Sequence, residues 1–411
     1  MTIRPGRRTA TAAVAAVLGT GALLGAAPAG AAPAASAAPA MTLLPTGVPS
    51  KPYSDPTGVN GHGVAVGYAY AWTQGREASA VRWAADGTPV TLPPLPGEDF
   101  AQALGVNDAD VTIGISWPAT RDHWQPTAVR WAADGTPTAL PPLPGDLYST
   151  ATAIGGSGIV VGTSYSSSVD PHAVAWRPDG TTVALAPLPG DTSSAATGVN
   201  AAGLAIGRSY TGIGAFHGIV WSPDGTPTRF QTGPTAGRGD WPVAINDAGT
   251  VIGVADRPLD VGSTRHGLVR SPSGALRDLG AHTLPTAVNA SGTVVGEYRP
   301  DPDQLVTEAA RWSPDGTLTP LSPTPPSGGN SIAVGINDAG TAIGYGWSGI
   351  PARQYQSGRT WASGGTVTDL DPARTGNNAL FVNNAGLVVG LALYRPPGNL
   401  YPTHQVAVWR P

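Results

Sequence analysis

Short apolar runs alternate with turn residues along almost the whole chain. One unit has runs at 103–107, 111–114, 127–131 and 138–143, rich in Val, Ile, Leu, Ala and Thr and bounded by Gly, Pro, Asn or Asp. Runs of this length and composition predict β-strands joined by turns. After residue 41 no stretch keeps a 3.6-residue apolar period long enough for a helix. The pattern therefore predicts an all-β protein.

The same unit recurs eight times, and its clearest copy runs from Gly335 to Gly344 (Gly-Ile-Asn-Asp-Ala-Gly-Thr-Ala-Ile-Gly). Successive copies are separated by 43 to 48 residues. A fixed period in this range is typical of repeat architectures. The Asn of the unit falls at Asn60, Asn107, Asn200, Asn246, Asn289, Asn337 and Asn383, with Gly155 in the third copy. The closing glycine falls at Gly67, Gly114, Gly162, Gly207, Gly253, Gly296, Gly344 and Gly390.

Two tight turns occur in each unit. The first, Asn-Asp-Ala-Gly at 246–249 and 337–340, places an Asn whose side chain can bond the backbone two residues on, and a Gly suited to left-handed backbone. The second, Trp-Ala-Ala-Asp-Gly-Thr at 83–88 and 131–136, carries the Asp-Gly hairpin signal. The Asp residues of these turns are therefore interpreted as scaffold and not as a carboxylate site.

Four antiparallel strands in each of eight units predict an eight-bladed β-propeller. Residues 41–47 resemble fourth strands such as 91–97, while the last strand, ending at Trp409, matches a third strand. We therefore expect the strand at 41–47 to complete the last blade and close the ring. An open β-solenoid is the alternative, although it has no need of this complementarity.

The N-terminal region has a different composition. Arg4, Arg7 and Arg8 precede an Ala/Val/Leu/Gly run that Pro28 closes, and A-x-A choices follow, so residues 1–31 are predicted to be a signal peptide. A permanent membrane anchor is the alternative, and the export route, Sec or twin-arginine, stays open. Residues 32–40 form an Ala/Pro-rich spacer, and the propeller spans 41–411. We expect an extracellular location.

Composition excludes several classes of protein. The net charge is −4 and arginine is spread along the chain, so no basic stripe points to nucleic acid. Cysteine is absent, which excludes disulfides and thiolate metal sites. Beyond the signal peptide no apolar run approaches the roughly 20 residues that span a bilayer. We expect a monomer without a membrane span.

The links between strands fall into two groups. Strand direction alternates within a blade, so the two tight turns lie at one end of the ring, here called the tight-turn end. The links from second to third strand, and from fourth strand to the next blade, lie at the opposite long-loop end. These links are longer and differ between units. Seven tryptophans close third strands and are predicted to pack in or between blades: Trp83, Trp131, Trp176, Trp221, Trp312, Trp361 and Trp409, with Arg270 in the fifth unit.

The remaining tryptophans lie in the variable links, together with many tyrosines and arginines. These three residue types bind partners well because they offer large rigid surfaces and directional donors. The alternative is that they fold back and cap the core. The candidate ligand-binding residues are Trp72, Arg76, Trp117, Arg121, Trp124, Tyr165, Tyr210, Trp241, Tyr298, Arg299, Trp347, Tyr355, Tyr394 and Arg395.

Polar chemistry elsewhere is sparse. His172, His217 and His266 occupy one third-strand position in consecutive units, about 12–15 Å apart given the spacing of strands, too far to share a zinc ion. We expect them to make repeated hydrogen bonds, and we expect no metal and no cofactor. The acids of 297–303 are interpreted as solvated loop charge in preference to a Ca²⁺ or catalytic site. Arg-Gly-Asp at 238–240 is weak evidence for cell adhesion. No catalytic motif is present, so no catalytic residue is predicted.

The unit G-[IV]-N-x-x-G-x-[VA]-[VI]-G, followed by His-Ala-Val-Ala-Trp at 172–176 or His-Gly-Ile-Val-Trp at 217–221, resembles the HAF-repeat family of bacterial extracellular proteins. Val or Ile stands where that family has Phe, and several units lack the His. The resemblance covers nearly all of 41–411 and implies a secreted repeat protein, without an activity or functional residues to transfer.

Together these observations predict a secreted propeller that binds an extracellular glycan or protein through its long-loop end. The alternatives are a secreted propeller enzyme acting on polysaccharide, as a hydrolase or lyase, and a structural protein of the cell envelope. The absence of a catalytic motif favours binding over catalysis.

Overall fold

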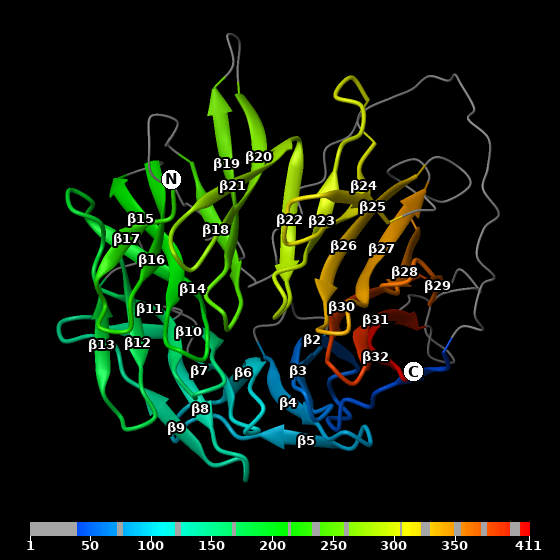
Figure 1. The fold of residues 1–411 in the computed structure, drawn as a ribbon. Helices are drawn as coiled ribbons and strands as arrows, with labels where there is room; N and C mark the ends of the chain where they lie inside the picture. Colours follow the sequence, from blue (N-terminus) through cyan, green and yellow to red (C-terminus); the bar gives the residue numbers. More distant parts are fainter. Residues whose placement is uncertain are drawn as a thin grey trace, which may run out of the picture.

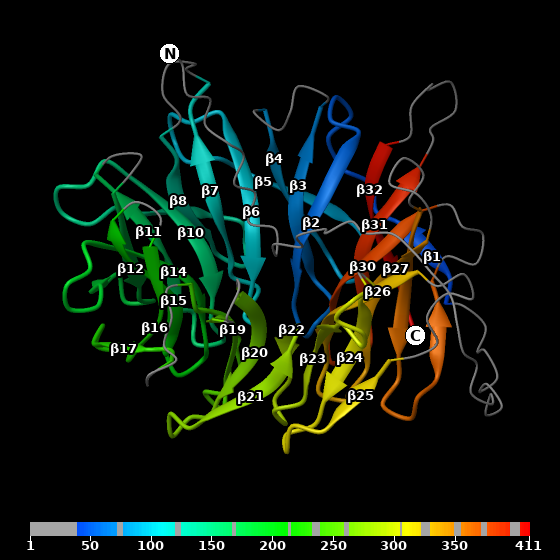
Figure 2. The ribbon, with the colours of Figure 1, turned by 90° about the horizontal axis from the view of Figure 1, so that it is seen from above.

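The computed structural model describes residues 39–71, 77–119, 125–166, 170–212, 215–231, 239–258, 263–304, 306–321, 329–348, 355–370, 376–394 and 403–411. Within these ranges all regular secondary structure is β-strand, arranged as eight four-stranded antiparallel sheets. The sheets follow one another around a ring (Figures 1 and 2). The prediction of an eight-bladed β-propeller is confirmed. The predicted signal peptide, and the spacer as far as residue 38, lie outside the described residues.

Neighbouring first strands contact one another around the ring, which shows that the first strand of each blade is the innermost. From the inside outwards, blade one consists of β2 (Tyr53–Val59), β3 (Ala65–Tyr70), β4 (Ser79–Trp83) and β5 (Pro89–Leu92), and blade two of β6 (Phe100–Val106), β7 (Thr112–Trp117), β8 (Thr127–Trp131) and β9 (Pro137–Leu140). Blade three consists of β10 (Tyr148–Ile154), β11 (Val160–Tyr165), β12 (Pro171–Trp176) and β13 (Thr182–Leu185), and blade four of β14 (Ser193–Val199), β15 (Ala205–Gly212), β16 (Ala215–Trp221) and β17 (Pro227–Arg229).

Blades five to seven repeat this order, and blade eight takes its outermost strand from the N-terminal side of the chain. Blade five consists of β18 (Trp241–Ile245), β19 (Val251–Pro258), β20 (Ser263–Arg270) and β21 (Leu276–Ala281), and blade six of β22 (Thr283–Val288), β23 (Val294–Tyr298), β24 (Glu308–Trp312) and β25 (Leu318–Pro320). Blade seven consists of β26 (Asn330–Ile336), β27 (Ala342–Ser348), β28 (Tyr355–Trp361) and β29 (Val367–Asp369), and blade eight of β30 (Asn377–Val382), β31 (Val388–Tyr394), β32 (Thr403–Trp409) and β1 (Met41–Leu43).

Ring closure occurs as the sequence predicts. β1 pairs antiparallel with β32, with Met41 opposite Trp409 and Leu43 opposite Ala407. The Leu44 amide extends the ladder by donating to the carbonyl of Val406 at 2.8 Å. In Figure 1 the blue start of the chain accordingly lies beside the red C-terminal strands. A strand from one end of the chain therefore completes a blade formed by the other.

The closing glycine of every unit accommodates a bulge in the innermost strand. In blade two the register between β6 and β7 shifts between Ala103 and Gly105. The bulge moves a carbonyl towards β7, so a Cβ added at Gly114 would lie 1.9 Å from the oxygen of Gln102. The same added atom would lie between 1.9 and 2.5 Å from the equivalent carbonyl in all eight blades. Only glycine fits this position.

The repeated asparagine joins neighbouring blades as well as closing its own turn. The Asn60 Oδ1 accepts hydrogen bonds from the amides of His62 and Val64, as predicted for the turn. Its Nδ2 donates to the carbonyl of Asn107 at 3.0 Å. Similar bonds run from blade to blade until the Nδ2 of Asn383 donates to Asn60, also at 3.0 Å. The seven donors are Asn60, Asn107, Asn200, Asn246, Asn289, Asn337 and Asn383.

Gly155 interrupts this ring of amide bonds. A Cβ at Gly155 would lie 2.7 Å from the carbonyl oxygen of Asn200, so the backbones of blades three and four approach too closely for a side chain. Its own carbonyl still accepts from the Nδ2 of Asn107 at 3.3 Å. Close backbone approach is a common reason for glycine within a repeated polar position.

The hydrophobic core lies between blades and is anchored by the third-strand tryptophans. All seven are at most 2% exposed, which confirms their predicted packing role. Trp131 of blade two packs against Val66 and Leu92 of blade one. Its indole N–H donates to the carbonyl of Pro93, and Trp83 likewise donates to Pro45, both at 2.7 Å. Each of these two indole groups thus joins its blade to the preceding fourth strand.

Candidate functional site

Blade five departs most from the repeat. Its strands β19 and β20 have eight residues each, and they extend beyond their neighbours at the top of Figure 1. In blade two, residues 141–147 connect the fourth strand to the next blade, but in blade five only His282 separates β21 from β22, with φ of 58°. Trp312 correspondingly finds no acceptor for its indole nitrogen among the described residues. The long-loop end is therefore built differently here.

Two arginines and two aromatic rings meet at this part of the long-loop end. The guanidinium of Arg208, on β15, lies 4.9 Å from the ring centre of Phe216 and 5.5 Å from that of Trp241. Arg265, on β20, lies 5.4 Å from the same Trp241 ring. The two rings contact each other edge to face at 6.0 Å. Contacts of this kind contribute about 0.5–1 kcal/mol each at exposed sites. They hold all four side chains in one cluster.

The charges in the Arg208–Phe216–Trp241–Arg265 cluster are only partly balanced. Arg265 pairs with Asp256 at 3.5 Å, and both side chains are well exposed. Within the described residues Arg208 forms no ion pair and no side-chain hydrogen bond, and its only recorded partners are the two rings. The cluster therefore offers a partly exposed guanidinium whose donors are not committed to a carboxylate.

A buried acid follows in blade six. Glu297 lies in β23, is 8% exposed, and burial raises the pKa of its carboxyl to about 7. Thr307, Arg299 and Arg265 oppose this rise. The interpretation of this acid as solvated loop charge is therefore wrong: the position after a closing glycine lies within the second strand, where the blade buries it. Asp301, by contrast, forms a surface turn with Asp303 and Gln304.

A second buried acid, Asp240, occupies a repeated hydrogen-bonding position in blade five. In other blades the side chain at this position joins two blades by hydrogen bonds. In blade four the Ser194 hydroxyl accepts from the amide of Ala173 on the third strand of blade three, and it donates to the carbonyl of Leu185. Neither oxygen of Asp240 accepts a hydrogen bond of good geometry among the described residues. Burial raises the pKa of this carboxyl, while the nearby Gly218 amide, Arg229 and His217 oppose the rise. At 2% exposure, Asp240 is also inaccessible to an adhesion receptor. Burial thus argues against the Arg-Gly-Asp hypothesis.

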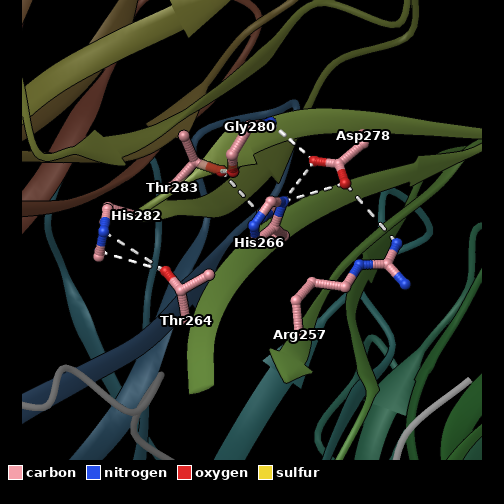
Figure 3. Close-up of polar contacts among 8 residues, drawn as sticks. Arg257, Thr264, His266, Asp278, Gly280, His282 and Thr283 are labelled. Atoms are coloured by element: carbon pink, nitrogen blue, oxygen red, sulfur yellow. Dashed lines mark hydrogen bonds and ion pairs between the residues drawn. The ribbon is translucent and has the colours of Figure 1, made fainter. Parts of the chain in front are cut away.

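Blade five also carries a polar network between its outer strands, shown in Figure 3. The Asp278 carboxylate lies 2.9 Å from the Nδ1 of His266 and 3.6 Å from the Nη2 of Arg257, and it accepts from the amide of Gly280. Thr283 donates to the Gly280 carbonyl at 2.7 Å. The contacts join β19, β20 and β21 to the start of blade six, and so stabilise the short link.

The three third-strand histidines each bind a different carboxylate. His172 contacts Asp146 at 2.9 Å, and His217 contacts Asp191 at 3.2 Å. With His266 and Asp278, these pairs confirm the predicted hydrogen-bonding role of the position. Within the described ranges, no group of three or more His, Asp or Glu side chains could hold a metal ion.

The predicted binding residues that the structure describes have different roles. Tyr210 lies 6.3 Å from Phe216, so it joins the edge of the arginine–aromatic cluster with Trp241. Tyr165 stacks on Tyr148 at 4.8 Å in blade three, away from that cluster. Trp347 lies 5.9 Å from Tyr345 in blade seven. The structure thus brings together Tyr210 and Trp241, and separates them from the other aromatic pairs.

Two other candidates pack inward. Trp117 is 6% exposed and packs with Ala78 and Ile115, which favours the alternative that it caps the core. The hydroxyl of Tyr298 donates to Glu308 at 3.3 Å, while burial raises the pKa of this tyrosine to about 12. Arg299 is half-buried after β23. Trp72, Arg76, Arg121, Trp124 and Arg395 lie outside the described residues, as do the side chains of Tyr355 and Tyr394.

Sequence reasoning missed Arg208, Phe216 and Arg265, and it interpreted Glu297 as solvated loop charge. Arg208 and Glu297 each follow a closing glycine, and this position is occupied in other blades by residues as different as Tyr68 and Thr163. Variation at one position of an otherwise regular unit is a signal that could have found them. Phe216 and Arg265 belong to third strands, which the variable-link criterion excluded.

No protein-family model and no curated protein matches the chain. Solved structures resemble its fold. One of two prolyl endopeptidases studied for inter-domain dynamics matches at 12% identity and TM-score 0.52, over 86% of this chain and 54% of its own. A post-proline cleaving enzyme from Rickettsia typhi matches at 9% and 0.50, over 82% and 57%. The propeller domain of the Trilobed protease from Pyrococcus furiosus matches at 8% and 0.48, over 73% and 89%.

The chain thus spans little more than half of the two peptidases. At these identities the likeness concerns the β-propeller fold alone. None of the described residues forms a helix that could cross a bilayer.

Proposed function

We propose that the chain is a secreted β-propeller that binds an extracellular ligand, a glycan or a protein, at its long-loop end. The arginine–aromatic cluster of Arg208, Phe216, Trp241 and Arg265 forms the centre of the site. The observation that carries this proposal is that residues from two blades hold one another in place while remaining partly exposed. Side chains fixed before binding lose little conformational freedom on binding, which favours affinity.

The position of the cluster also supports binding. It lies where blade five departs from the repeat, between the long β19–β20 hairpin and blade four. Rigid strands that present variable residues at one end are a common basis for recognition. Trp, Tyr and Arg are the residue types that most often dominate the energy of such interfaces.

Secretion is part of the same proposal. The export signal pattern of residues 1–31, and the resemblance to the HAF-repeat family, support an extracellular location. N-terminal sequencing of protein recovered from the culture medium is expected to give a start close to residue 32. An intact N-terminus on cell-bound protein would contradict export with cleavage.

The binding proposal is tested by a screen of the purified protein against glycan and surface-protein arrays. The Phe216→Ala/Trp241→Ala double variant is expected to lose at least tenfold in affinity for the ligand found. Tyr148→Ala is the matched control, since it removes an aromatic ring at the same end but in blade three. Equal affinity of the double variant and the wild type, with both folded, would refute this site.

A specific observation favours a second candidate function, a secreted enzyme acting on polysaccharide. The Glu297 carboxyl has a pKa of about 7 beside Arg299 and Arg265, and a carboxyl shifted in this way is typical of general acids and bases. The groups that shift it include no second carboxylate, so the two-acid arrangement of glycoside hydrolases is not supported.

Catalysis by Glu297 predicts release of reducing or unsaturated sugar from some polysaccharide, with activity lost in Glu297→Gln. Circular dichroism of the variant would show whether the loss reflects unfolding. Activity that survives in folded Glu297→Gln would exclude this residue as the acid or base.

A further inference from the structure

The geometry points to a more specific ligand: we propose that the Arg208–Phe216–Trp241–Arg265 cluster binds a carboxylate-bearing sugar, as found in polysaccharides of uronic acids. This inference rests on the proposed function and names the class of ligand for the same site. Two chemical features of the cluster have to be matched by one ligand: flat apolar surface and uncompensated positive charge.

The apolar surface comes from the two partly exposed rings. Phe216 and Trp241 meet edge to face at 6.0 Å, with Tyr210 beside Phe216 at 6.3 Å. Ring surfaces at fixed angles suit ligands that have flat C–H faces and hydroxyl edges, and pyranose rings have both. An extended neutral peptide would use the rings without any need for the nearby arginines.

The positive charge comes mainly from Arg208. Its guanidinium lies over both rings and, among the described residues, meets no acid. Because neither ring provides a conventional hydrogen-bond acceptor, the N–H donors of this guanidinium remain available, and they match the two oxygens of a carboxylate. Arg265 adds a second guanidinium, 5.4 Å from the ring centre of Trp241, although Asp256 partly neutralises its charge.

The acids around the cluster do not cancel this charge. Asp240 is buried, burial raises the pKa of its carboxyl, and the charged groups that act on it are Arg229 and His217, not the arginines of the cluster. Glu297 interacts with Arg265, but burial raises the pKa of its carboxyl to about 7, so this acid is only partly ionised at neutral pH. Asp256 is the one exposed acid paired with the cluster within the described residues. Among the described residues, Arg208 is therefore the cationic group of the cluster that an anionic ligand meets without a competing ion pair.

The test compares polygalacturonate with the same polymer after methyl esterification, which keeps the sugar rings and removes the charge. Binding of the purified protein is measured by calorimetry at two salt concentrations. Polygalacturonate is expected to bind at least tenfold more tightly than its ester, with affinity falling at high salt. Equal binding of the two polymers would overturn the inference.

Two variants locate the interaction. Arg208→Gln is expected to reduce the preference for the acidic polymer about tenfold or more, and Arg208→Lys to retain part of it, because lysine keeps the charge but not the paired donors. Arg177→Gln is the control, since this arginine contacts Pro223 at the tight-turn end. A preference that Arg208→Gln leaves unchanged would overturn the assignment to this site.

The outcomes also separate the inference from the proposed function. Suppose that Trp241→Ala abolishes binding of a ligand from the array screen while Arg208→Gln does not. The proposed binding site would then be supported, and the proposal that its ligand is an acidic sugar would be rejected. If poly-glutamate competes for the site as effectively as polygalacturonate does, the site binds acidic protein segments. This result would also overturn the proposal of an acidic sugar ligand. Loss of binding in both variants, with unchanged melting temperatures, is the result expected.

Discussion

The two ends of the propeller use the same strands in opposite ways. At the tight-turn end, asparagine amides bond from blade to blade and return to Asn60, so the repeated polar groups satisfy one another. At the long-loop end of blades four and five, rings and guanidinium groups contact one another, but within the described part of the chain the donors of Arg208 bind no acceptor. In the regular repeat the polar groups bond to one another, whereas at blades four and five the repeat is broken and polar and aromatic groups stay partly exposed. This difference supports the proposal that the long-loop end binds a ligand.

The largest effect is expected from removing the strand that closes the ring. Deleting residues 41–47 removes β1, the buried Leu44 and the Pro45 carbonyl that accepts from Trp83. We expect the melting temperature to fall sharply and unfolding to lose cooperativity, as calorimetry would show. Stability equal to that of the full chain would contradict the closure of the ring by β1.

The next effect concerns the closing glycine. Gly114→Ala places a methyl group 1.9 Å from a carbonyl oxygen, and relief requires loss of the bulge, so we expect a cost of at least about 3 kcal/mol in the free energy of unfolding. Gly364→Ala is the control, because an added Cβ there meets no atom within 4 Å. Similar urea midpoints for the two variants would refute the bulge explanation.

The ring of amide bonds predicts a smaller loss. Asn246→Asp keeps the oxygen that accepts from Thr250 but removes the Nδ2 that donates to Asn289 at 2.8 Å. Because a buried carbonyl then loses its partner from the next blade, we expect a cost of about 1–3 kcal/mol, measured by urea unfolding. Stability of Asn246→Asp equal to that of the wild type would show that the bond to Asn289 contributes nothing, because the variant keeps the oxygen that closes the turn.

The fold of this protein is more predictable from its sequence than the contacts between its blades. The period, the turn residues and the match of 41–47 to a fourth strand were sufficient for the blade count and for ring closure. They could not reveal which carbonyl a side chain reaches in the next blade, because that depends on how the blades pack. Glu297 illustrates the limit: its charge suggested solvent, yet its place one residue after Gly296 puts it inside a strand.

The smallest effect is expected at Asp240, and it depends on pH. The pKa of Asp240 in the folded protein is raised above the ordinary value of 3.8. Its protonated form therefore contributes to the stability of the fold at pH values below 3.8. This contribution is lost as the pH rises through the pKa of the folded protein. Asp240→Asn is expected to stabilise the protein near neutral pH by on the order of 1 kcal/mol and to flatten this pH dependence. A destabilising effect at neutral pH would show that attraction to Arg229 and His217 outweighs the cost of burying the carboxylate.

Hydrogen–deuterium exchange with and without ligand compares the two ends directly. With polygalacturonate, or with the ligand found by the array screen, the binding proposal predicts slower exchange in residues 205–212, 215–221, 239–245 and 263–270, which include Arg208, Phe216, Trp241 and Arg265. Exchange in the asparagine turns, such as 60–64 and 246–250, is expected to stay unchanged. Protection confined to those turns, with none at blades four and five of the long-loop end, would contradict it.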